Sequence, residues 1–169
     1  MRAGISDVNL LPSTTKGGAA LHSLVVQFRV ANAIAAGASN QISLDGTASL
    51  FDTTVGSLTF PDVTGACNLT RQATSTDSLL VLQLDPLCAI GAGQMFAFTV
   101  PDAAVTINPA AGTEVRVTVT ATNNLNTGDN TGTYMTDADG MPLLGTSCFH
   151  SAWMVAVLCP LCFRVLGAR

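Results

Sequence analysis

The chain has 169 residues and a formal net charge of −4, and only 11% of its residues are charged. This length suits one domain with a sizeable core. The net negative charge gives no basic patch for a phosphate backbone, so we expect no nucleic acid among its partners. The chain has a single lysine, Lys16, but 21 threonines, so its polar surface must consist mainly of hydroxyls and amides. Such a composition is more typical of an extracellular β-module than of a cytosolic enzyme.

Apolar and polar residues alternate with a period of two along most of the chain, which predicts half-buried antiparallel strands. In residues 23–30, for example, Leu24, Val26 and Phe28 share one face. The predicted strands cover residues 8–11, 23–30, 42–44, 58–60, 68–71, 79–84, 95–100 and 114–120. Many short strands separated by turns indicate a sandwich or a barrel. We expect an all-β, antiparallel two-sheet sandwich of seven to nine strands, with very little helix before residue 148.

A short motif, Ala-Ile-x-Ala-Gly, occurs twice, in residues 33–37 and 89–93, each time ahead of a predicted strand. We interpret the two copies as matching corners of the sandwich. Gly37 and Gly93 would supply backbone freedom where the chain reverses, and the isoleucines would close the end of the core. The alternative is chance similarity between short loops in a chain with 15 glycines.

Four stretches in order, "VNLLPSTTKGGA", "LVVQFRVANAIAAGASNQISL", "SLLVLQLDPLCAIGAGQMFAFTVPDA" and "TEVRVTVTAT", carry a resemblance. Together they resemble the immunoglobulin-like β-sandwich repeats found in tandem in large surface proteins of microbial eukaryotes. The matching positions are Pro12, Ser13, Thr14, Thr15, Ile34, Gly37, Ile90, Gly93 and Pro101. The resemblance covers residues 6 to about 133 and implies an extracellular scaffold or adhesive module without assigned catalytic residues. The repeats occur in arrays, whereas this chain has one module, as expected of a fragment or a shortened gene product.

The pattern divides the chain into three parts. Residues 1–135 form the predicted β-sandwich module, 136–147 an exit loop, and 148–169 an apolar, cysteine-containing tail. The apolar run 152–163 is shorter than the roughly 20 residues that a membrane helix needs. It fits a truncated membrane segment or an acylated interfacial segment, and the alternatives are a buried terminal segment or a non-native tail. Residues 1–11 lack a signal-peptide core, so we expect any export signal outside these 169 residues.

Three residues, Cys67, Cys88 and Asn68, carry the predicted covalent chemistry of the sandwich. Cys67 and Cys88 lie at the edges of predicted strands, and we expect them to form a disulfide in an oxidising compartment. The alternative is a pair of free, buried thiols. Asn68 begins the sequon Asn68-Leu69-Thr70 and is the predicted glycosylation site, which fits a secreted protein.

Acidic residues near the end of the predicted sandwich raise the possibility of calcium binding. In "TDADG", Asp137 and Asp139 have the spacing of ligands in a calcium loop. The first and last ligand positions of such a loop would be Met135 and Thr146, neither of which is suitable. The alternative is an ordinary acidic turn that closes the domain.

The tail offers a metal or redox alternative. Four of its residues could form a tetrahedral zinc set: Cys148, His150, Cys159 and Cys162. The segment Cys159-Pro160-Leu161-Cys162 also has the C-x-x-C spacing of redox centres, but no βαβ pattern surrounds it. We assign no role to these cysteines and predict neither a metal site nor a cofactor.

Catalysis has little support in the sequence. The chain has no G-x-S-x-G nucleophile motif, and its single glutamate, Glu114, gives no pair of glutamates for acid–base work. We therefore expect a non-catalytic structural or adhesive module of a cell-surface or extracellular protein. Its partners would be other protein modules or cell-surface components, and the membrane through the tail. The alternative is a β-sandwich that binds calcium or a glycan with its end loops. Trp153 and Tyr134 are the sole Trp and Tyr, so the chain has few aromatic rings of the kind that stack on a sugar.

Overall fold

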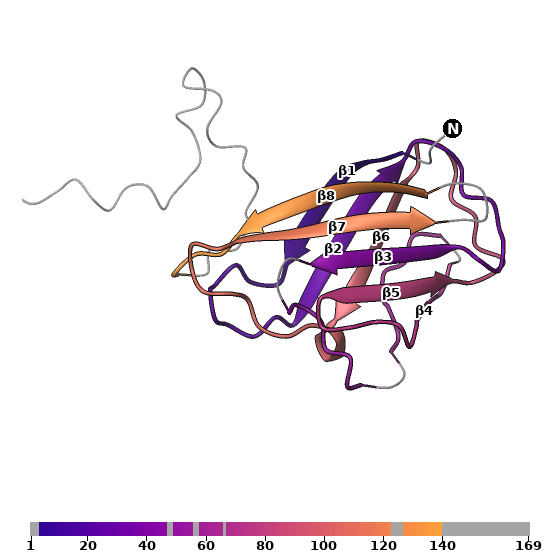
Figure 1. The fold of residues 1–169 in the computed structure, drawn as a ribbon. Coiled ribbons are helices and arrows are strands. Elements are labelled where there is room, and N and C mark those ends of the chain that lie inside the picture. Colours follow the sequence, from indigo (N-terminus) through magenta and orange to yellow (C-terminus); the bar gives the residue numbers. More distant parts are fainter. Residues whose placement is uncertain (1–3, 47–48, 56–57, 66, 123–126, 140–169) are drawn as a thin grey trace, which may run out of the picture.

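The computed structural model describes residues 4–46, 49–55, 58–65, 67–122 and 127–139. Within them the backbone forms eight strands and one short 3-10 helix (Figure 1). The strands are β1 (Ile5–Pro12), β2 (Ser23–Val30), β3 (Gln41–Gly46), β4 (Leu69–Arg71), β5 (Leu79–Leu84), β6 (Met95–Pro101), β7 (Glu114–Thr122) and β8 (Thr127–Met135). The helix, η1, spans Asp102–Ala104.

The strands form two antiparallel sheets. One sheet has three strands in the order β1-β2-β6, and the other has five in the order β4-β5-β3-β7-β8. Figure 1 shows the two sheets stacked with their faces toward each other. The prediction of an all-β, two-sheet sandwich with seven to nine strands is thus confirmed. The part of the chain that the structure describes contains no helix long and apolar enough to cross a membrane.

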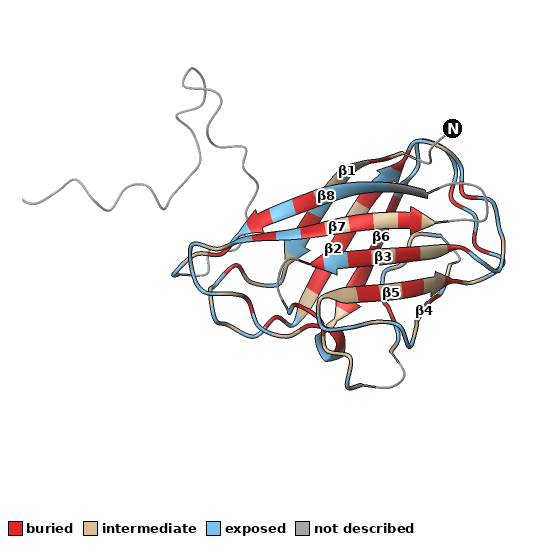
Figure 2. Ribbon diagram, in the orientation of Figure 1, coloured by how far each residue is buried: buried red, intermediate tan, exposed pale blue. Residues whose placement is uncertain are grey.

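Burial follows the alternation in the sequence, and the buried residues line the space between the sheets (Figure 2). Leu24, Val26 and Phe28 of β2 are fully buried, as are alternate residues of β5 and β7. The ring centroids of Phe28 and Phe96 lie 5.7 Å apart, and those of Phe96 and Phe98 lie 6.1 Å apart. These rings belong to the neighbouring strands β2 and β6, so one aromatic cluster spans both strands.

Residues 58–60, predicted as a strand, do not form one. Phe60 is buried, and the chain just after it lies along the outer edge of β6. The Thr64 N–H donates to the Ala97 carbonyl at 2.9 Å, and the Thr99 N–H donates to the Pro61 carbonyl at 3.0 Å. Pro61 has no backbone N–H to donate, which limits a regular ladder of hydrogen bonds at this edge. The segment nevertheless covers an edge that would otherwise be open to another chain.

The first and last strands close the opposite side of the sandwich. β1 and β8 belong to different sheets but lie side by side. A Cβ atom added to Gly132 of β8 would come within 2.7 Å of the Val8 side chain and 2.9 Å of the Leu10 side chain. Only glycine allows β1 to approach β8 this closely. The Asn130 side-chain amide also donates to the Ile5 carbonyl at 3.2 Å.

Candidate functional site

The repeated motif marks the two points where the chain changes sheets at one end of the sandwich. Its first copy connects β2 to β3, and its second connects β5 to β6 in the reverse direction. Ile34 and Ile90 pair with each other: each N–H donates to the other's carbonyl, at 2.8 and 2.9 Å. Both isoleucines are buried. The predicted matching corners are therefore confirmed, and they meet in one place.

The two glycines of the motif behave differently. Gly93 has a φ of +72°, in the left-handed region that favours glycine, as the sequence predicts. Gly37 has no such conformation, and a Cβ atom there would lie 3.9 Å from the Asn40 side chain, in ordinary contact. The prediction that Gly37 is needed for backbone freedom is wrong. The first corner is held instead by buried Asn40, whose side-chain amide donates to the Ala35 carbonyl at 2.6 Å.

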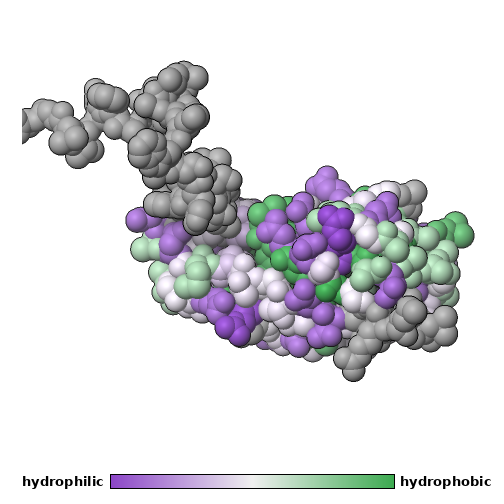
Figure 3. Space-filling model, turned by 90° about the horizontal axis from the view of Figure 1, so that it is seen from above, coloured by the Kyte–Doolittle hydropathy of each residue, from purple (hydrophilic) through white to green (hydrophobic). Residues whose placement is uncertain are grey.

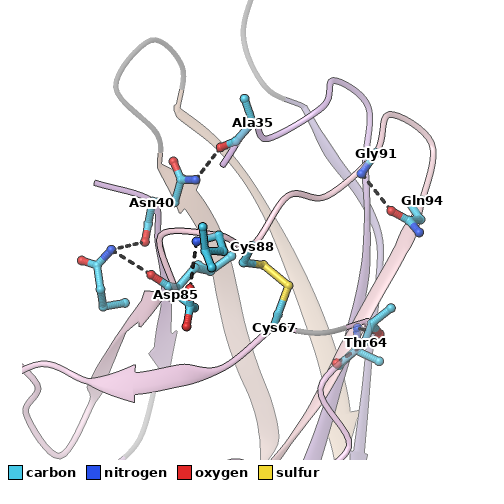
Figure 4. The surroundings of a disulfide bond; sticks show 12 residues. Ala35, Asn40, Thr64, Cys67, Asp85, Cys88, Gly91 and Gln94 are labelled. Carbon is cyan, nitrogen blue, oxygen red and sulfur yellow. Dashed lines mark hydrogen bonds between the residues drawn. A yellow bond between two sulfur atoms is a disulfide. The ribbon is translucent and has the colours of Figure 1, made fainter. Parts of the chain in front are cut away.

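The disulfide lies at the same corner (Figure 4). The structure bonds Cys67, just before β4, to Cys88, just before the second corner, with their Cα atoms 5.0 Å apart. The bond spans a sequence separation of 21. Closing such a loop stabilises a fold by about 3 kcal/mol when the effect is attributed to the entropy of the unfolded chain. The disulfide thus links the edge strand β4 to the connection between the sheets.

A tight turn beside the disulfide is built by Asp85. The Cys88 N–H donates to the Asp85 carbonyl at 2.9 Å, and the Leu87 N–H donates to the Asp85 carboxylate at 2.8 Å. The Asp85 N–H in turn donates to the Asn68 carbonyl at 2.9 Å. An aspartate that accepts from the backbone two residues ahead is a common way to form such a turn. The turn leaves Leu87 88% exposed.

The predicted glycosylation site lies at the free edge of the five-stranded sheet. Asn68 directly precedes β4, and both Asn68 and Thr70 are exposed. Among the described strands β4 pairs with β5 alone, so it is an edge strand of three residues. The backbone carbonyl of Asn68 is held by Asp85, and the side chain is accessible at the surface.

A network of neutral polar groups closes the other end of the sandwich. The buried Tyr134 hydroxyl donates to the Asn108 side-chain oxygen at 2.8 Å. The Asn108 amide donates to the carbonyls of Thr14 and Lys16 at 2.7 and 3.2 Å. Burial raises the pKa of Tyr134 to about 12. Sequence reasoning did not find this network, because an asparagine in a predicted loop gives no sign of burial.

The two candidate calcium ligands lie beside this network and differ in their surroundings. The Asp137 carboxylate accepts a hydrogen bond from the buried Thr15 hydroxyl at 2.8 Å. The Asp137 backbone also pairs with Thr15 and Gly17. Asp139 is exposed. Among the described residues, no three His, Cys, Asp or Glu side chains gather where they could hold a metal ion. The zinc and redox candidates of the tail lie outside the described residues: Cys148, His150, Cys159 and Cys162.

Ionisable side chains form separate exposed pairs on different elements. His22 lies 3.3 Å from Asp102, Arg29 lies 3.1 Å from Asp7, and Arg116 lies 2.7 Å from Glu114. The first pair joins the segment before β2 to η1, and the second joins β1 to β2. The third joins two positions along β7.

One loop is fixed by charged residues. The Arg71 guanidinium donates to the Asp52 carbonyl at 3.2 Å and also to the Val55 carbonyl. Hydrogen bonds from the Thr54 hydroxyl and from the Thr54 backbone N–H, and to a lesser extent the nearby Arg71 charge, hold the pKa of Asp52 below its usual range. These contacts order residues 52–55.

The exposed apolar side chains are similarly scattered. Among the described residues, the large ones are Leu11, Leu87, Met95, Ile107 and Met135, which belong to different elements or loops. Figure 3 shows hydrophilic and hydrophobic residues interspersed over the face that it displays.

The chain matches no protein-family model, no curated protein sequence and no solved structure. Its class therefore rests on the fold itself. It is an all-β protein whose eight described strands form a sandwich of two antiparallel sheets, and its described part contains one disulfide.

Proposed function

We propose that the chain is a non-catalytic structural or adhesive module of an extracellular or cell-surface protein. The disulfide between Cys67 and Cys88, with the exposed sequon of Asn68 beside it, is the observation that carries this proposal. Disulfides persist in oxidising compartments, and N-glycosylation takes place in the secretory pathway. Both chemistries favour the same location, and they meet at one corner of the fold.

We further propose that the sandwich is of the immunoglobulin type. The order β1-β2-β6 has the pattern of the A, B and E strands of immunoglobulin domains, and β3-β7-β8 has that of C, F and G. Residues 61–64, along the outer edge of β6, take the place of strand D. This order supports the resemblance to the repeat modules of microbial-eukaryote surface proteins. The hairpin of β4 and β5 is an addition beside β3.

The compartment is tested on protein taken from the cells that produce it. Intact cells are first treated with a membrane-impermeant amine reagent, which can reach exposed Lys16, the sole lysine, only from outside. Thiols are then alkylated before lysis, and peptides are mapped without reduction and after removal of N-glycans. We expect labelled Lys16, a peptide pair linked through Cys67 and Cys88, and conversion of Asn68 to aspartate. Unlabelled Lys16 together with alkylated Cys67 would refute the proposal.

Adhesion is tested separately from location. Beads coated with the oxidised chain are mixed with uncoated beads and with cells of the producing organism, and their association is counted. Retention on cells but not on bare beads would support an adhesive module, whereas no retention would favour a purely structural one. A turnover activity assigned to the folded chain would contradict both.

A further inference from the structure

The sequon at Asn68 is fixed within the folded sheet, although two of its three side chains are exposed. Leu69 is buried in the core, whereas Asn68 and Thr70 lie at the surface. The Asp85 N–H donates to the Asn68 carbonyl at 2.9 Å. Thr70 pairs with Gln83 in the ladder between β4 and β5. One edge and one face of the sequon are therefore covered by the protein itself.

The residues on both sides of the sequon are fixed as well. Cys67, directly before it, is bonded to Cys88, which is buried (Figure 4). Arg71, directly after it, donates from its guanidinium to the carbonyls of Asp52 and Val55. The sequon is thus held at both ends as well as along one edge. It can leave the sheet only if the disulfide is open or the fold is lost.

N-glycosylation requires more of a sequon than exposed side chains. The Asn68 amide nitrogen is a weak nucleophile, so a transferase must hold the asparagine and the Thr70 hydroxyl in its own site before the reaction. The amide nitrogen then bonds to the anomeric carbon of a lipid-linked oligosaccharide and loses one proton, while the bond from that carbon to the phosphate oxygen of the carrier breaks. A segment bonded along one edge, with its middle residue in a core, cannot be surrounded in this way.

We propose that glycan transfer to Asn68 must precede closure of the disulfide, which then ends the reaction. The order follows the chain, because Cys88 and β5 come after the sequon and cannot restrain it when it is first made. The Cys67 and Cys88 thiols later give two protons and two electrons to an oxidant in the disulfide form, which becomes a dithiol. The glycan does not prevent this step, because the exposed Asn68 side chain keeps it at the surface. This regulation deepens the proposed extracellular function, on which it rests.

The first corner offers a matched control, because a sequon there would lie outside the strands. Gly37 has room for a side chain and its φ is not left-handed. Ala38 and Ser39, which follow it, are exposed and belong to no strand. Gly37→Asn creates a sequon with Ala38 and Ser39, and this sequon should accept a glycan even in the folded, oxidised chain.

Transfer is measured on the purified full chain, with a solubilised oligosaccharyltransferase and a lipid-linked oligosaccharide, by mass spectrometry of peptides. The oxidised chain is compared with a chain whose cysteines are reduced and alkylated in denaturant before transfer to the assay. An alkyl group on buried Cys88 prevents refolding, so the sequon of the second sample stays free. We expect a glycan on Asn68 in the alkylated chain and none in the oxidised chain. In the oxidised Gly37→Asn chain, the loop should be glycosylated while Asn68 stays unmodified.

A double variant, Cys67→Ala with Cys88→Ala, separates the effect of the disulfide from that of the fold. Its melting transition, followed by circular dichroism, should remain, because the ladder of β4 and β5 and the core are unchanged. Without the disulfide the short edge strand β4 opens more often, so transfer to Asn68 should be at least roughly 10-fold faster than in the oxidised chain.

Three results would overturn the proposal. They are a glycan on Asn68 of the oxidised chain at the rate of the loop, no glycan on Asn68 of the alkylated chain, and equal rates in the double variant and the oxidised chain. None of these results depends on where the protein resides. Labelling of Lys16 on intact cells tests the location independently, so the two proposals can fail separately.

Discussion

Neutral polar side chains hold both ends of the sandwich together. Asn40 fixes the corner near the disulfide, and Asn108 joins Tyr134 to the loop after β1 at the other end. Among the described residues, every buried side-chain nitrogen or oxygen has a hydrogen-bond partner. A buried amide or hydroxyl costs little when it is paired and much when it is not. A chain with few charges can therefore build its internal polar contacts from Asn, Thr and Tyr.

Tyr134 makes the fold sensitive to alkaline pH. Its pKa is raised to about 12 by burial, from an ordinary value of 10.0. Between these two values the unfolded chain loses the phenolic proton while the folded chain keeps it, so the stability of the fold decreases as pH rises. We expect a loss of about 2 kcal/mol from pH 10 to 12, seen in denaturant unfolding at each pH.

The same residue provides a control for this loss. Tyr134 is the sole tyrosine, so the absorbance of tyrosinate reports its titration directly. Tyr134→Phe should remove that part of the pH dependence and lower the stability at neutral pH by about 1–2 kcal/mol, because the bond to Asn108 is lost. Titration of Tyr134 at an ordinary pKa in the folded protein would contradict the buried network.

The two aspartates proposed for calcium should respond differently to substitution. Asp137→Ala removes the acceptor of the Thr15 hydroxyl and should lower the stability by about 1–2 kcal/mol. Asp139→Ala, at an exposed position, should change it by less than about 0.5 kcal/mol. We expect added calcium to leave the melting temperature of the unmodified chain unchanged. A calcium-dependent rise that disappears in the double variant would instead support the binding-domain alternative.

At the scale of the strands, close approach decides which glycines matter. Gly132→Ala places a methyl group against Val8 and Leu10, where β1 and β8 meet, and should lower the stability by about 1–3 kcal/mol. Gly37→Ala is the matched control, because its Cβ atom has room and its φ is not left-handed. It should be neutral or stabilise the fold by about 0.5 kcal/mol. Chemical denaturation measures both, and equal effects would contradict the packing described for β8.

The disulfide should stabilise the corner where β4 and both crossings meet. Replacing Cys67 and Cys88 together by alanine should lower the free energy of unfolding by about 3 kcal/mol, since the unfolded chain regains the freedom of the closed loop. Unfolding in urea, without reductant, measures the loss. Reducing the unmodified protein should bring it to nearly the same stability. If the double variant is as stable as the oxidised protein, the bond does not constrain the fold.

For the whole molecule, the last described contacts with the sandwich lie just after β8. Thr136 and Asp137 are still bonded to it, through Thr113 and Thr15. A chain ended at Gly140 keeps these contacts and should melt within a few degrees of the full chain, with equal or better solubility, because the apolar run 152–163 is removed. Calorimetry and light scattering measure the two effects. Unfolding on truncation would mean that the run, including Trp153, belongs to the core.

Sequence reasoning succeeded where side chains alternate and did less well where partners are distant. Residues 23–30 and 79–84 were predicted as strands with the correct inner faces, because burial on one side requires that alternation. β8 was not identified as a strand of its own: its sequence, TGDNTGTYM, is rich in Gly, Asn and Thr and has no apolar stripe. β8 becomes a strand because β7 offers it a full ladder and because Gly132 admits β1. The strand predicted at residues 58–60 was wrong because its short apolar pattern comes directly before a proline, which interrupts a ladder.

By itself, then, the sequence determined the class of fold, the inner faces of the main strands, and the two isoleucine corners, since all three depend on local patterns of burial and turn formation. Only the tertiary structure decided that the two corners bond to each other, that Asn108 is buried beside Tyr134, and that Asp137 reaches Thr15. The last of these contacts joins residues 122 positions apart. Such contacts depend on how the sheets stack and how the ends of the chain meet, and no local pattern of residues encodes that geometry.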